Sequence, residues 1–105
     1  MKLSPKTRQI IEKMFLPQQH APIERALLDE CGNNLPWHKN SSEGELERVR
    51  FAVLKLSAGD AEKLSREIRG AQIDWRDTLM AAGFGHSVTQ HLTWAEQYLS
   101  TTQTS

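Results

Sequence analysis

Residues typical of helix starts and helix ends recur along this chain at short intervals. Of all features of the sequence, this spacing most limits the folds that the chain can adopt. Ser4 followed by Pro5 predicts a helix start, because the Ser hydroxyl caps an unpaired backbone N–H and proline at the first helical position loses no hydrogen bond. The stretches 42–45, 57–60 and 87–90, each opened by Ser, repeat this signal as capping boxes. Pro17, Gly32 and Gly83 predict helix ends. Only short helices fit between these signals.

The composition favours helices over strands. Leu and Ala together number 21, whereas the β-branched apolar residues Val and Ile number only 8. No segment alternates apolar and polar residues as a half-buried strand does, and no Asn-Gly or Asp-Gly hairpin signal occurs. We therefore expect an all-α fold, a compact bundle of five to six short helices.

Each expected helix has one apolar face at helical spacing. In chain order the inward residues are Ile10, Ile11, Met14 and Phe15; then Ile23, Ala26 and Leu27 in a helix opened by Pro22; then Leu46, Val49, Val53 and Leu56; then Ala61, Leu64 and Ile68 in a helix through Arg69; then Trp75, Leu79 and Ala82 in a helix that Asp74 caps; and finally Val88, Leu92, Ala95 and Leu99. We expect one helical domain over residues 1–99, with a helical hairpin at 1–31 and a main unit at 42–99. Residues 100–105 are expected to be a disordered polar tail.

Charge and cysteine content exclude several classes of protein. Thirteen basic residues balance thirteen acidic ones, and a net charge of zero removes the simplest argument for a nucleic-acid partner. The single cysteine cannot form a disulfide within the chain. The chain has no apolar run of about 18 residues and no signal-peptide core near its start, so we expect a cytoplasmic protein without a membrane segment.

A series of short motifs runs through most of the chain. They are Glu-Cys-Gly-Asn-Asn-Leu-Pro at 30–36, Leu-Ser-Ala-Gly-Asp at 56–60, Asp-Trp-Arg-Asp at 74–77 and Ala-Ala-Gly-Phe at 81–84. In these motifs the chain resembles an uncharacterised family of short bacterial proteins. The resemblance implies a cytoplasmic bacterial origin, and it implies no activity and no functional residue.

The candidate ligands and nucleophiles do not form a site at suitable spacing. A helical metal site needs ligands at i and i+4, whereas His86 and His91 are five residues apart. Cys31 follows Asp29 and Glu30 near an expected helix C-terminus, where negative charge disfavours the reactive thiolate. We therefore expect no catalytic residue, no metal and no cofactor.

One alternative function is a small enzyme. Asp74, Arg76, Asp77 and His91 would supply acid–base groups if they gathered around one cleft. A structural interpretation competes with this, because Asp74 suits a helix cap and Asp77 complements the helix dipole.

A second alternative is a nucleic-acid-associated regulator. The expected helices within 74–99, joined by a turn with Gly83, would form a pair like a helix-turn-helix. Arg76, however, is the last basic residue of the chain, and a recognition unit needs Lys or Arg to contact phosphates. We therefore do not expect a nucleic-acid partner.

An aromatic stripe near the end of the chain gives the leading hypothesis. His91, Trp94 and Tyr98 lie at i, i+3 and i+7, beside the expected core face of the same helix. The second face indicates a second partner, either a neighbouring chain or the loop that carries Trp37. Together Trp37, His91, Trp94 and Tyr98 form the candidate contact surface. We expect a non-catalytic helical protein-interaction module that binds a protein partner or itself, as in a homodimer; the alternative is that the loop covers Trp94 within the monomer.

Overall fold

The computed structural model describes residues 3–31 and 43–100, and within them every regular element is an α-helix. The helices are α1 (Pro5–Met14), α2 (Pro17–Glu30), α3 (Glu43–Ser57), α4 (Ala61–Ala82) and α5 (Gln90–Ser100). The expected all-α bundle is confirmed. Ser100, expected in the polar tail, is instead the last residue of α5. Trp37, Gly32, Ser42 and positions 101–105 lie outside the described residues.

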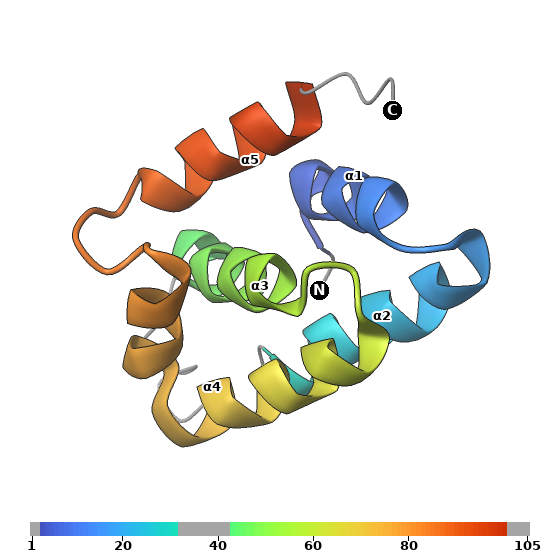
Figure 1. The fold of residues 1–105 in the computed structure, drawn as a ribbon, viewed down its shortest axis with the longest axis horizontal. Helices are drawn as coiled ribbons and strands as arrows, with labels where there is room; N and C mark the ends of the chain where they lie inside the picture. The colour runs from blue at the N-terminus through green and yellow to red at the C-terminus, as the bar shows by residue number, and fades with distance from the viewer. Residues whose placement is uncertain (1–2, 32–42, 101–105) are drawn as a thin grey trace.

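Helix α3 is the central element of the bundle. It lies in the middle of the molecule, with α1 and α5 above it and α4 below it in Figure 1, and it contacts all three. Every residue from Val49 to Leu54 is buried, so α3 is covered around most of its circumference rather than along one stripe. The expected stripe residues Leu46, Val49 and Val53 are buried, and Leu56 is partly buried.

Helices α1 and α2 both begin at a proline, but different side chains cap them. Ser4 caps α1 as predicted, and its hydroxyl accepts a hydrogen bond from the Thr7 N–H at 3.2 Å. The prediction that Pro22 opens the second helix is wrong, because α2 begins at Pro17 and Pro22 lies inside it. The Gln19 side chain accepts from the Leu16 N–H at 3.1 Å, which caps the helix before Pro17.

The corner between α3 and α4 is capped by a different residue from the one expected. The sequence predicted Ser57 as the cap, but α3 continues through Ser57 and Asp60 caps α4. The Asp60 carboxylate accepts from the N–H groups of Glu62 and Lys63 at 2.9 and 3.1 Å. Two residues in the left-handed region, Ala58 and Gly59, turn the chain first, and this displaces the cap by three positions.

Helix α4 combines two expected helices into one bent element. Asp74 departs from helical geometry, with φ −152° and ψ 89°, and its carboxylate accepts from the N–H groups of Arg76 and Asp77 at 3.2 and 3.3 Å. The capping role of Asp74 is therefore confirmed, although residues 70–73 are helical rather than a connection. The predicted end is also confirmed: Gly83 has φ 83°, and the Phe84 N–H donates to the Leu79 carbonyl at 2.8 Å.

Helix α5 packs only part of its expected face, Ala95 and Leu99, on the core. Ala95 is buried as predicted, but the side chain of Val88 is 71% exposed and that of Leu92 is 38% exposed. The predicted capping box is present: the Ser87 hydroxyl accepts from the Thr89 N–H at 3.1 Å, and the Gln90 side chain accepts from the Ser87 N–H at 3.2 Å. The regular helix nevertheless begins only at Gln90. Val88 therefore lies in the preceding turn, and the aromatic side of α5 faces inward.

Candidate functional site

Three residues of the predicted contact surface pack inside the chain. His91 is only 4% exposed, and Trp94 and Tyr98 are partly buried against the core. The ring centroids of His91 and Trp94 lie 5.4 and 6.1 Å from that of Phe51, both in edge-to-face geometry. Tyr98 stacks on Trp94 at 5.5 Å. A partner contact through this surface stays a prediction, and its fourth member, Trp37, lies outside the described residues.

These rings form the aromatic cluster that seats α5, defined here as Phe51, Phe84, His91, Trp94 and Tyr98. Phe84 completes it from the turn after α4, with its centroid 6.2 Å from His91 and 6.0 Å from Trp94. Such separations lie in the favourable range for aromatic pairs, which adds to the area the rings bury. The inward side of α5 is therefore fixed by ring packing against α3 and against the turn that follows α4.

The exposed side chains of Val88 and Leu92 line a hollow between α3 and α5. This hollow has a volume of about 290 Å3 and is lined by Gly44, Glu45, Glu47, Arg48, Val88, His91 and Leu92. A neighbouring hollow of about 230 Å3 is lined by Arg48, Trp75, Arg76, Leu79, Met80 and Gly85. Met80 is 57% exposed. We call the two hollows and the exposed side chains of Val88, Leu92 and Met80 the contact face.

Arg48 belongs to both hollows and fixes the turn between α4 and α5. Its Nη2 donates to the carbonyl of Phe84 and, at 3.2 Å, to that of Ser87. A guanidinium on two backbone carbonyls is a charge-assisted contact, stronger than a neutral hydrogen bond. The position of Val88 relative to α3 is therefore set by Arg48 rather than by burial of Val88 itself.

The contact face carries charges of both signs. Glu45 and Glu47 line it from the first turns of α3, while Arg48 and Arg76 line it from α3 and α4. The Ser4 hydroxyl donates to the Glu47 carboxylate. Beneath these groups, burial lowers the pKa of His91; the charge of Glu47 opposes this shift and that of Arg48 adds to it.

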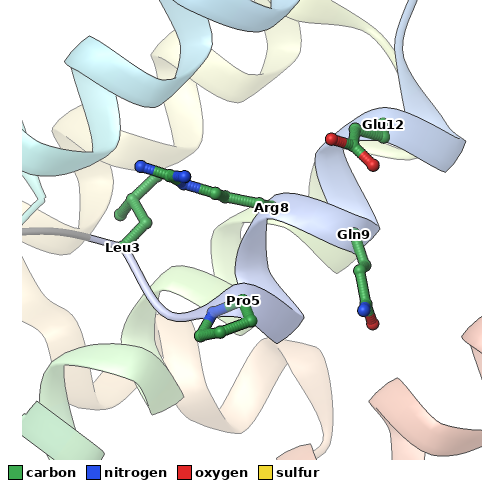
Figure 2. Close-up of a pocket in the computed structure, with 5 residues that line it drawn as sticks. All are labelled: Leu3, Pro5, Arg8, Gln9 and Glu12. Carbon is green, nitrogen blue, oxygen red and sulfur yellow. The ribbon is translucent and has the colours of Figure 1, made fainter.

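A third hollow lies beside α1, and its polar groups do not converge. It has a volume of about 430 Å3 and is lined by Leu3, Pro5, Arg8, Gln9 and Glu12. In Figure 2 the Arg8 side chain extends over Leu3, whereas Gln9 and Glu12 point away from it. Since its polar groups do not point at a common position, this hollow gives no basis for a ligand site.

The groups proposed for an enzyme lie in separate environments. Asp74, Arg76 and Asp77 are exposed on α4, and Asp74 is engaged in capping. Arg76 lies over the Trp75 ring at 5.3 Å. Arg76 and His91 line different hollows, and His91 is buried. The four groups proposed for an enzyme therefore do not line one common cleft in the structure.

The single cysteine is a core residue. Cys31 is fully buried, and burial raises the pKa of its thiol to about 12. Arg50 donates from Nε to the carbonyl of Cys31 at 3.1 Å and to that of Leu27 at 3.3 Å, which caps the end of α2. Within residues 3–31 and 43–100 no group of three or more His, Cys, Asp or Glu side chains could hold a metal ion.

The sequence did not indicate the contact face, because its apolar spacing assigned Val88 and Leu92 to the core.

Comparisons with protein-family models, with curated proteins and with solved structures find no match to this chain. Among the described helices none is long and apolar enough to cross a membrane.

Proposed function

We propose that this chain is a non-catalytic helical protein-interaction module of a bacterial cytoplasmic protein, and that it binds a second copy of itself through the contact face. The observation that carries this proposal is the exposure of three aliphatic side chains, Val88, Leu92 and Met80, around two adjoining hollows. Apolar side chains grouped around concave surface favour a protein contact over a solvated surface. The motif resemblance supports the bacterial cytoplasmic setting.

Charge supports a second copy as the partner. In a two-fold symmetric dimer the same patch meets itself, so each group must find its complement within that patch. The contact face provides Glu45 and Glu47 as well as Arg48 and Arg76, which allows acids of one copy to meet bases of the other. The net charge of the whole chain is zero, so two copies do not repel each other.

Sedimentation velocity over a concentration series tests this proposal. The wild-type chain should dimerise, and Val88→Glu or Leu92→Glu should weaken the dimer more than about tenfold, because burying an unpaired carboxylate costs more than about 1.4 kcal/mol. Leu16→Glu is the matched control, since Leu16 is 58% exposed and lines neither hollow. A wild-type chain that stays monomeric at millimolar concentration, or a face variant that dimerises as well as Leu16→Glu, contradicts the proposal.

Nucleic-acid binding is supported less well. The stretch between α4 and α5 runs from Gly83 to Thr89, longer than the three or four residues of a helix-turn-helix connection. Neither this stretch nor α5 contains Lys or Arg. The phosphate contacts that supply most of the affinity for DNA would have to come from elsewhere.

A further inference from the structure

His91 connects the contact face to the core. Its side chain lines the hollow beside Val88 and Leu92, and its ring packs edge-on against Phe51 and Phe84. The Nδ1 atom is buried and has no hydrogen-bond partner among the described residues. A neutral imidazole fits this aromatic seat, whereas an imidazolium would place a charge there without a partner for that nitrogen.

The two halves of α5 are held by different parts of the bundle. Helix α5 contacts α3 and α1. Its first half is held by the rings of Phe51 and Phe84, and its second half is held by α1, where Lys13 donates to the Tyr98 carbonyl and lies 4.6 Å from the centre of the Tyr98 ring. A change at His91 therefore acts on the half of α5 that borders the contact face.

The charged groups around His91 come mainly from α3. Glu45, Glu47 and Arg48 line the same hollow, and Lys55 lies over the Phe84 ring at 5.1 Å. From α1, Ser4 donates to Glu47, so this carboxylate is already engaged when His91 is neutral. Glu47 favours the charged imidazole, while burial and Arg48 disfavour it, and the balance lowers the pKa of His91.

We propose that His91 is a proton-operated latch: its protonation in mildly acidic solution favours release of the N-terminal half of α5 from α3 and so weakens the contact face. The consequence for dimerisation rests on the proposed function, whereas the release of α5 does not.

The pH range follows from ordinary titration behaviour. An unfolded His titrates near about pH 6.5 and Glu near about 4.3, so at pH 5.5 His side chains are the groups that change charge. If the seated His91 stays neutral at that pH, the equilibrium constant for opening α5 rises by up to about tenfold relative to pH 7.5.

Hydrogen exchange followed by mass spectrometry tests the latch. Protection factors, which correct for the pH dependence of intrinsic exchange, should fall by up to about tenfold in residues 90–94, in the N-terminal half of α5, between pH 7.5 and 5.5, while those of α2 change little. His91→Phe keeps an aromatic ring in the seat but cannot bind a proton, so its α5 protection should not depend on pH. His86→Gln, at an exposed position before α5, should behave like the wild type.

The outcomes separate the latch from the proposed function. Selective loss of α5 protection that His91→Phe abolishes supports the latch, and His91→Met serves if the Phe variant does not fold. Unchanged wild-type protection, or an equal loss in the non-titrating variant, overturns it. If sedimentation finds only monomer at both pH values while α5 is still released, the proposed function fails and the latch stands.

Discussion

Gly83 is the residue at which α4 ends and the chain turns towards α5. Its φ of 83° lies in the left-handed region, where an L-residue with a Cβ is strained. A Cβ built at Gly83 would meet no atom closer than Lys55 Nζ at 3.8 Å, so the strain comes from the backbone and not from crowding.

Gly83→Ala should therefore lower the free energy of unfolding by about 1–2 kcal/mol, the usual left-handed penalty. Gly70→Ala in the same helix is the matched control. A Cβ at Gly70 has nothing within 4 Å, and alanine should stabilise this helical position by about 0.5–1 kcal/mol. Urea unfolding of both variants measures the difference, and equal effects would show that the turn does not need a left-handed residue.

Cys31 gives a second prediction at the scale of one residue. Its thiol is fully buried with a pKa of about 12, so the reactive thiolate is scarce and inaccessible in the folded chain. An aromatic disulfide reagent at pH 8 should react slowly in buffer and rapidly in concentrated urea. Since the chain has one cysteine, the signal has no background. Rapid labelling without urea would contradict the burial of Cys31.

At the scale of the element, each helix end depends on a local cap, and the sequence locates most of these ends to within three residues. Ser4, Asp74 and Gly83 act as predicted, because the groups they satisfy lie within four residues along the chain. One exception is the start of α2, which lies at Pro17 and not at Pro22, and another is the corner after α3. Its two left-handed residues leave Ser57 at the end of α3, where its hydroxyl donates to the Leu54 carbonyl at 2.7 Å.

Asp60→Ala should thus cost about 1 kcal/mol of unfolding free energy, the usual loss for an N-cap. The Asp60 side chain accepts two backbone N–H groups and is exposed, so the variant removes little else. Asp60→Asn keeps an acceptor oxygen and should retain most of the stability in the same thermal melts. If Asp60→Ala and Asp60→Asn melt together with the wild type, the carboxylate does not cap α4.

For the whole molecule, the buried His91 makes stability depend on pH. Its pKa is lowered by burial, with Glu47 opposing and Arg48 reinforcing the shift. Below the ordinary His pKa of about 6.5 the unfolded chain binds a proton that the folded chain takes up less readily. The unfolding free energy is therefore complete above this pH and falls as the pH drops through the window below it.

Urea unfolding of the wild type and of His91→Phe at about pH 7.5 and 5.5 checks this at the level of the whole domain. The loss of stability at the lower pH should be smaller in the variant, and His20→Gln, which removes a partly buried His on α2, provides a comparison. Identical losses in the wild type and in His91→Phe would mean that other groups carry the acid sensitivity.

The candidate site could be predicted only in part. The aromatic residues His91, Trp94 and Tyr98 were recognised as a second apolar face that packs inward in the structure; of the expected core face, Ala95 and Leu99 pack on the core, whereas Val88 and Leu92 are exposed. Both faces of α5 have helical spacing, so periodicity along the chain could not rank them. The hollows of the contact face depend on Arg48, which donates to the carbonyls of Phe84 and Ser87. These residues follow Arg48 by 36 and 39 positions, and no local sequence pattern indicates contacts over such a separation.

The sequence by itself determined the all-α class, the caps at Ser4 and Asp74 and the turn at Gly83, because these features depend on neighbours within one helical turn. Only the tertiary structure decided that Pro22 lies inside α2 and that Val88 and Leu92 face outward. Which side of α5 packs inward depends on the positions of Phe51 and Phe84 in the assembled bundle. Aromatic rings pack favourably against other rings at close range, so His91 and Trp94 turn towards them.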